Sequence, residues 1–339
     1  MTAAQILPAL VALVPVLCFL GLLLYLDSYA LVKPRAVLGV VAAGALLAGA
    51  SYFINGLVLD ATGMDFRAYS RYVAPCIEEV LKALVIIALV RANRIGFLVD
   101  AAIFGFAVGT GFALVENLVY LQRLPDAHLA VWVVRGFGTA LMHGGATALF
   151  AVIALARLDQ SHGAALRSYA AGLLAAAALH AAFNQAWPSP VVAALGVMLL
   201  VPGLLMLAFA RSEKALAQWL GSGFDADAQL IELIDSGAFA ESPAGQYVAT
   251  LKRSLSGPQV ADALCYLRLY TELALRAKGL LMLRENGFTP PPADAETHSR
   301  LDELKYLEGS LGATQVRALQ PLLRMDRKQL WQVNLLRSV

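Results

Sequence analysis

The chain has 339 residues, of which 59% are hydrophobic and only 15% are charged, and its formal net charge is +2. Soluble domains carry roughly 25% charged residues, so most of this chain is too apolar for an ordinary soluble fold. No run of basic residues is long enough to neutralise a phosphate backbone, which argues against a nucleic-acid partner.

The apolar residues gather in seven segments that are long enough to span a bilayer. The expected segments are 5–26, 36–59, 71–90, 98–121, 128–156, 168–186 and 190–210. They lack the alternation of lipid-facing and lumen-facing residues that is typical of barrel strands, so we expect helices. The first segment is expected to remain in the mature protein, because no positively charged region precedes it.

The distribution of charge divides the chain near Arg211. Residues 1–211 hold 12 of the 26 lysines and arginines and 9 of the 24 acidic residues, and the shorter part, 212–339, holds the others. The second part shows apolar residues at helical spacing, such as Leu267 and Tyr270. We therefore predict an all-α polytopic membrane protein of about seven transmembrane helices. Its transmembrane domain covers 1–211, and a soluble, cytoplasmic all-α domain covers 212–339.

Ionisable side chains occur within four of the apolar segments, although a charge at mid-bilayer costs roughly 2.5–3.5 kcal/mol on insertion scales. In chain order, these segments carry Glu78, Glu79 and Lys82, then Glu116 and Asn117, then Arg135 and His143, and then His180 and Asn184. Spacings of three or four residues place Lys82 on one helix face with the glutamates, and His180 with Asn184. Under the orientation derived below, and at about 1.5 Å per residue, Glu78, Glu79, Glu116 and His180 are expected roughly 9–12 Å below the outer surface, with His143 deeper. They can therefore converge in the outer half of the bilayer.

This set of side chains is suited to hydrolysis of a peptide bond. A buried carboxylate can take a proton from water and pass it to the leaving amine. Imidazoles, or the amide of Asn184, can stabilise the oxyanion. Two histidines and a glutamate are also a ligand set for catalytic zinc, which is the alternative. The His-Glu-x-x-His motif of many zinc proteases does not occur in the sequence, so the preferred interpretation has no cofactor.

The order of these motifs resembles that of PrsW-type intramembrane proteases, in the superfamily of the CAAX prenyl endopeptidases and bacterial CPBP proteins. The similar motifs lie within about residues 70–186 and are Glu78-Glu79-x-x-Lys82, Gly111-Phe112-Ala113-x-x-Glu116-Asn117, His143 and His180-x-x-x-Asn184. The resemblance implies that Glu78 and Glu79 are the paired catalytic glutamates and that Glu116 is the acid of the second motif. A glutamate in the second motif favours the PrsW branch over the CAAX endopeptidases, which typically have histidine there. His143 and His180 correspond to the family's histidines.

We therefore predict an intramembrane endopeptidase that cleaves a membrane protein or a membrane-bound peptide. The predicted catalytic residues are Glu78, Glu79, Glu116, His143, His180 and Asn184. The resemblance makes an anti-sigma factor one class of substrate, and the lipid bilayer is the surrounding medium. A proton-coupled transporter remains an alternative, because proton relays use the same side chains. A non-catalytic membrane scaffold of the same fold is the other alternative, and Arg135 is interpreted as structural.

The lysines and arginines in the links between the segments predict the orientation. Eight of them lie on one side and three on the other. This places the N-terminus outside and the C-terminal domain in the cytoplasm, and we expect the membrane to be a bacterial inner membrane. A reporter fused after Val339 should be active only if it works in the cytoplasm, and one inserted between Trp187 and Pro190 should report the outside. A C-terminus found outside would contradict the orientation.

Overall fold

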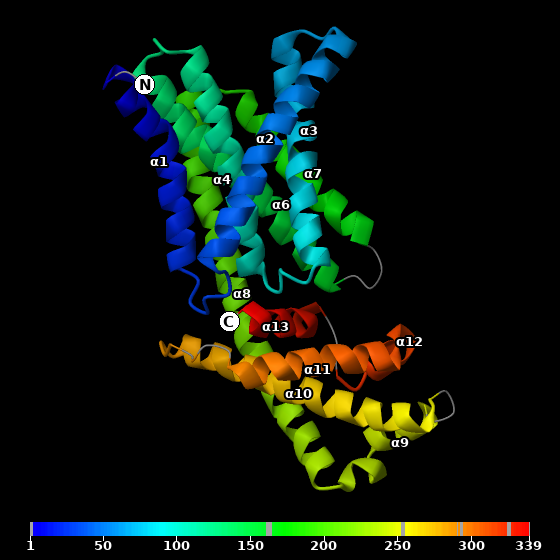
Figure 1. The fold of residues 1–339 in the computed structure, drawn as a ribbon. Helices are drawn as coiled ribbons and strands as arrows, with labels where there is room; N and C mark the ends of the chain where they lie inside the picture. Colours follow the sequence, from blue (N-terminus) through cyan, green and yellow to red (C-terminus); the bar gives the residue numbers. More distant parts are fainter. Residues whose placement is uncertain are drawn as a thin grey trace. The chain divides into compact units, whose positions relative to one another are not determined.

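The computed structural model describes residues 3–160, 165–251, 255–289, 291, 294–323 and 327–338. Every regular element in these ranges is helical. The chain separates into two compact units, Met1–Glu213 and Lys214–Val339 (Figure 1).

The first unit contains the apolar helices. They are α1 (Ala3–Tyr25), α2 (Pro34–Thr62), α3 (Phe66–Arg91), α4 (Leu98–Arg123), α5 (Leu129–Val133), the π-helix η1 (Val134–Thr139), α6 (Ala140–Gln160), α7 (Ala165–Asn184) and the start of α8 (Pro190–Asp235). Six helical stretches in the described residues are long and apolar enough to cross a membrane, with α5, η1 and α6 forming one of them. The prediction of an all-α polytopic membrane protein is therefore confirmed.

The segment expected as the third span forms α3, but α3 is not among those six stretches. The reason is its charge, because it carries Arg67, Arg71, Glu78, Glu79, Lys82 and Arg91. The count of seven spans therefore stays a prediction. The helix that is least suited to lipid is the one that carries the paired glutamates.

α4 is the central helix of the first unit and is buried without interruption from Val99 to Ala113. It packs against α2 and against α6 (Figure 1). Glycine allows this close approach on both sides. A methyl group at Gly109 would overlap the carbonyl oxygen of His143, and one at Gly111 would overlap that of Val41. The backbones are thus close enough for polar side chains of α4 to reach α6.

Local capping determines where α2 ends and where α3 begins. Pro34 stands at the first helical position of α2, where its missing N–H is not needed. Gly63 ends α2 in the left-handed conformation that favours glycine. The side chain of Asp65 then accepts a hydrogen bond from the backbone N–H of Ala68 at 3.1 Å and starts α3. α3 therefore returns alongside α2 after a short turn (Figure 1).

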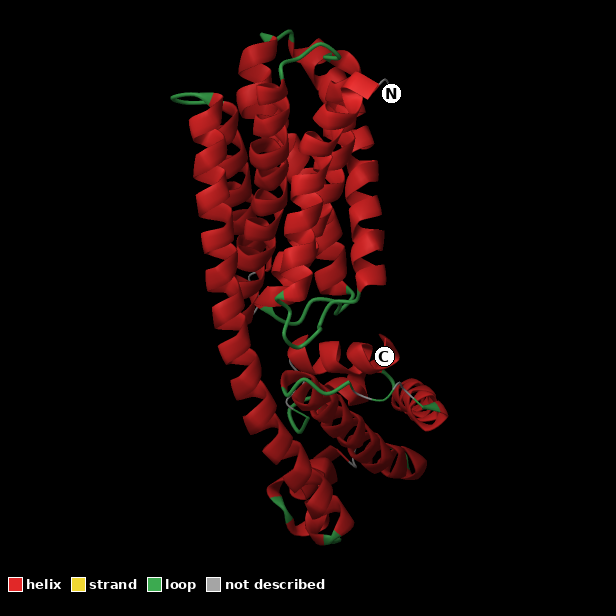
Figure 2. Ribbon diagram, turned by 90° about the vertical axis from the view of Figure 1, so that its left-hand side faces the viewer, coloured by secondary structure: helices red, strands yellow, loops and turns green. Residues whose placement is uncertain are grey.

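The second unit is a helical domain with its own apolar core. Besides the end of α8, it contains η2 (Ala238–Glu241), α9 (Pro243–Leu251), α10 (Gly257–Glu285), α11 (Ala295–Leu311), α12 (Ala313–Leu319) and α13 (Arg327–Ser338). Figure 2 shows helices joined by loops in this unit. Tyr266 and Leu273 of α10 belong to this core together with Leu304 of α11. Helix α8 continues past the domain boundary that the composition placed near Arg211. Residues 212–220 contain no glycine or proline that would end the helix. The composition therefore becomes more polar there, but α8 continues without a break.

Candidate functional site

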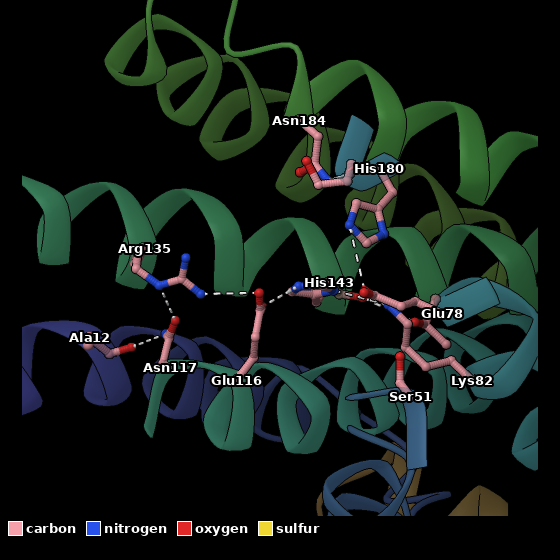
Figure 3. A network of polar contacts seen from close by, with 12 residues as sticks. Ala12, Ser51, Glu78, Lys82, Glu116, Asn117, Arg135, His143, His180 and Asn184 are labelled. Carbon is pink, nitrogen blue, oxygen red and sulfur yellow. Dashed lines mark hydrogen bonds and ion pairs between the residues drawn. The ribbon is translucent and has the colours of Figure 1, made fainter. Parts of the chain in front are cut away.

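Figure 3 shows the network of polar contacts that makes up the site, and a buried ion pair on α3 belongs to it. The Nζ of Lys82 lies 2.5 Å from Oε1 of Glu79, and the two side chains are 0% and 1% exposed. The other carboxylate oxygen of Glu79 lies 3.5 Å from the hydroxyl of Thr147 on α6. Removing either charged partner of such a buried pair leaves the other uncompensated, so Lys82 and Glu79 depend on one another.

His143 of α6 connects this ion pair to α4. The Nζ of Lys82 lies 3.0 Å from Nδ1 of His143, and Nε2 of His143 lies 2.8 Å from Oε2 of Glu116. Because an ammonium group can only donate, Nδ1 accepts, and Nε2 carries the proton that is donated to Glu116. These contacts assign a neutral His143 ring that is hydrogen-bonded on both sides.

His180 of α7 also contacts Glu79. Its Nδ1 lies 2.8 Å from Oε1 of Glu79, and its Nε2 lies 3.8 Å from Oε2 of Glu78. The rings of His143 and His180 meet edge to face, with centroids 4.8 Å apart. Glu79 thus holds one nitrogen of His180, and the second nitrogen faces Glu78.

Two carboxylates of the cluster keep part of their surface uncovered by the protein. The side chains of Glu78 and Glu116 are 17% and 28% exposed, whereas those of Glu79 and the two histidines are at most 3% exposed. The contacts of Glu78 are also longer, at 3.5 Å to Nδ2 of Asn55 and 3.8 Å to His180. Glu78 is therefore held less firmly than Glu79 and can exchange a proton or a partner more easily.

Several polar neighbours of the glutamates were not singled out by the sequence analysis. Asn55 of α2 faces Glu78, donates to Oγ of Ser51 at 3.0 Å and accepts from the hydroxyl of Tyr69 at 2.8 Å. Thr147 of α6 is a further neighbour. Ser51 and Asn55 lie four residues apart within an apolar segment, so they share a helix face. That spacing is the signal that could have pointed to them.

Asn184 lies one turn beyond His180, and its described contact joins helices. Its Nδ2 donates to the backbone carbonyl of Ser70 on α3 at 2.9 Å. The structure thus links five of the predicted residues through direct polar contacts: Glu78, Glu79, Glu116, His143 and His180. Asn184 joins the end of α7 to α3, and its contact with an oxyanion stays a prediction.

The residues that could hold a metal ion belong to the same cluster. Among the described residues, Glu78, His143 and His180 offer ligand atoms that all lie within 4.8 Å of one another. Two imidazoles and one carboxylate are a known ligand set for catalytic zinc. The donor chemistry of the cluster therefore suits a divalent cation.

The family model described as PrsW family intramembrane metalloprotease matches residues 33–209, which is more than half of the chain. The chain belongs to the PrsW family. This membership confirms the resemblance seen in the motifs and shows a membrane protease at the level of the family. Comparisons with curated proteins and with solved structures gave no match. The PrsW match includes every side chain of the cluster described above.

The contacts of the two adjacent glutamates predict different effects on the stability of this PrsW-family protein. Glu79→Gln leaves the ammonium of Lys82 without a counterion and should lower the free energy of unfolding by about 3–5 kcal/mol. Glu78→Gln changes a partly exposed group with long contacts and should alter it by less than about 1 kcal/mol. Unfolding of both variants in mixed micelles measures the difference.

The double variant Glu79→Gln/Lys82→Met is the control for this prediction. It removes both charges and should recover much of the stability that Glu79→Gln alone loses. Equal destabilisation by Glu78→Gln and Glu79→Gln would show that the Lys82 contact does not distinguish the two glutamates.

Proposed function

We propose that this chain hydrolyses a peptide bond of a membrane protein within the bilayer, at the cluster of Glu78, Glu79, Glu116, His143 and His180. The observation that supports this most is the connected network of buried ionisable groups from α3, α4, α6 and α7, with two carboxylates left accessible. Such groups are costly inside a membrane. A non-catalytic scaffold does not need them, and family membership favours proteolysis over proton transport.

In this proposal Glu78 is the proton acceptor. A water molecule gives its proton to Glu78 while its oxygen bonds to the scissile carbonyl carbon, and the proton then passes to the leaving nitrogen as the C–N bond breaks. Glu79 is a positioning residue, because it is held by Lys82 and in turn orients His180. The ring of His143 is fixed beside them and can stabilise the charge that develops on the oxygen.

Metal-assisted hydrolysis is the second candidate mechanism, and specific contacts favour it. Glu78, His143 and His180 would hold the ion, and His143 would give up one of its two present hydrogen bonds to do so. The hydrogen bond between Glu79 and Nδ1 of His180 is the type of contact that orients a histidine as a metal ligand. A bound zinc ion would supply Lewis-acid polarisation of the carbonyl and a more acidic water.

The charge balance of the cluster also favours a cation. With neutral imidazoles, Lys82 and Arg135 offset two of the three carboxylates, which leaves one formal negative charge. Glu116 would remain the accessible carboxylate that moves the proton. The sequence alone favoured a site without a cofactor, and the family description together with this charge balance makes zinc the second candidate beside the carboxylate mechanism.

The substrate proposal follows from depth and orientation. With the N-terminus outside, the cluster lies in the outer half of the bilayer, where a transmembrane or membrane-bound segment would enter. A single-span regulatory protein of the anti-sigma-factor class would present such a segment. We propose a bacterial inner membrane as the location.

Cleavage tests the proposed activity directly. In a deletion strain, a membrane protein should accumulate uncut when Glu78→Gln is expressed, and it should be cut when the wild type is expressed. In proteoliposomes, Glu78→Gln should cleave this protein at least about 100-fold more slowly than the wild type. Glu303→Gln is the matched control, because Glu303 is exposed on α11 and far along the chain from the cluster. Normal cleavage by Glu78→Gln would move the transporter and scaffold alternatives ahead.

Metal analysis tests the second proposal. Protein purified without chelators should contain about one zinc ion per chain, the number that one three-ligand site holds. Glu78→Gln and His180→Ala should lose the ion, whereas His298→Ala should retain it, because His298 is exposed on α11. Activity that survives complete removal of the metal would show that the carboxylates act alone.

A further inference from the structure

Arg135 is a largely buried cation that has no role in the proton transfer described above. Its Nη2 lies 3.3 Å from Oε1 of Glu116, and its Nε donates to Oδ1 of Asn117 at 2.9 Å. Its guanidinium carbon lies 3.7 Å from the centroid of the Tyr120 ring. Asn117 is itself held, because its Nδ2 donates to the backbone carbonyl of Ala12 on α1 at 2.8 Å. Side chains of α4 and the backbone of α1 thus fix the orientation of the guanidinium (Figure 3).

The π-helix η1 explains how Arg135 comes to share a side with His143. At about 100° per residue, eight residues of an unbroken α-helix would leave the two side chains about 80° apart around the axis. A π-turn accommodates one extra residue, so they lie as residues seven apart would, within about 20° of one line. The irregular turn Val134–Thr139 therefore directs Arg135 toward the carboxylate that also contacts His143.

We propose that Arg135 is a positioning residue for the proteolytic site, acting through Glu116 on His143. Glu116 uses Oε1 for Arg135 and Oε2 for Nε2 of His143, so the guanidinium determines where the second oxygen points. The Glu116 side chain is 28% exposed, so it can change its orientation when the ion pair with Arg135 is removed. His143 then loses the acceptor that fixes the orientation of its ring, while the contact with Lys82 still sets its tautomer. The structural alternative is that Arg135 only packs on Tyr120.

The proposal rests on the proposed proteolysis for its kinetic consequences, and a double-mutant cycle separates the two. The variants are Arg135→Met, Glu116→Gln and both together in the full chain, with Arg135→Lys as the conservative variant. Arg123→Met is the matched control, because Arg123 lies at the exposed end of α4 and contacts Tyr52 outside the cluster. The measurements are kcat and KM of cleavage in proteoliposomes and the unfolding midpoint in mixed micelles.

If Arg135 acts through Glu116, Arg135→Met should lower kcat at least about 10-fold and change KM less than about 3-fold. The double variant should then be no slower than Glu116→Gln alone. Arg135→Lys should restore part of kcat, since an ammonium can pair with Glu116 but lacks the planar fork that also reaches Asn117. Arg123→Met should cleave normally. Independent, multiplying losses in the double variant, or a normal kcat in Arg135→Met, would overturn the proposal.

The unfolding midpoint tests the coupling of Arg135 to Glu116 even if the wild type cleaves nothing. Absence of cleavage would contradict the proposed function and not this coupling. If Arg135 and Glu116 are coupled, Arg135→Met should lower the unfolding midpoint less in the Glu116→Gln background than in the wild type. In that background no carboxylate is left at position 116 to lose its partner. Packing on Tyr120 predicts the same loss in both backgrounds. That second result would leave Arg135 as a structural residue only.

Discussion

The ammonium of Lys82 has no exposed surface, although it lies in a bundle of apolar helices. A charge in that position is tolerated only where partners satisfy it. Glu79 supplies the counterion on the same helix, and His143 supplies a further acceptor from α6. The need to satisfy this one cation therefore draws α3 to α6 and leaves the proton of His143 on the nitrogen that faces α4. The contact of His143 with Glu116 depends on that assignment.

The close approach of helices makes these contacts geometrically accessible. α4 lies between α2 and α6 with glycine where the backbones meet, at Gly111 on one side and Gly109 on the other. A larger residue at Gly109 would push α6 away at the position of His143 itself. Packing and chemistry are thus coupled at one point, because the glycine that admits α6 also sets the distance over which Glu116 reaches the imidazole.

The adjacent glutamates show how one repeated residue can take two roles. The Glu79 side chain is directed inward and contacts both Lys82 and His180. The Glu78 side chain lies about 100° round the helix from it, and part of its surface is exposed. In the proposed mechanism, Glu79 orients its neighbours and Glu78 accepts the proton. On the other side of the cluster, the two oxygens of Glu116 have different partners. Arg135 contacts one of them and His143 contacts the other.

Local sequence patterns were enough to predict the fold class and most of the candidate site residues. Hydropathy was enough to predict the helical membrane fold, because a bilayer demands long apolar segments whose backbone groups are satisfied within each helix. Ionisable residues are so costly inside such segments that Glu78, Glu79, Glu116, His143 and His180 could be singled out one by one.

Only the tertiary structure decided which of them meet, because contacts between helices depend on packing distances that spacing along one helix does not contain. It turned Asn184 toward the backbone of Ser70, placed Asn55 beside Glu78, and used a π-turn to bring Arg135 to Glu116. Regular helical periodicity could not have predicted that turn, since the extra residue that it accommodates changes the very period on which such a prediction relies.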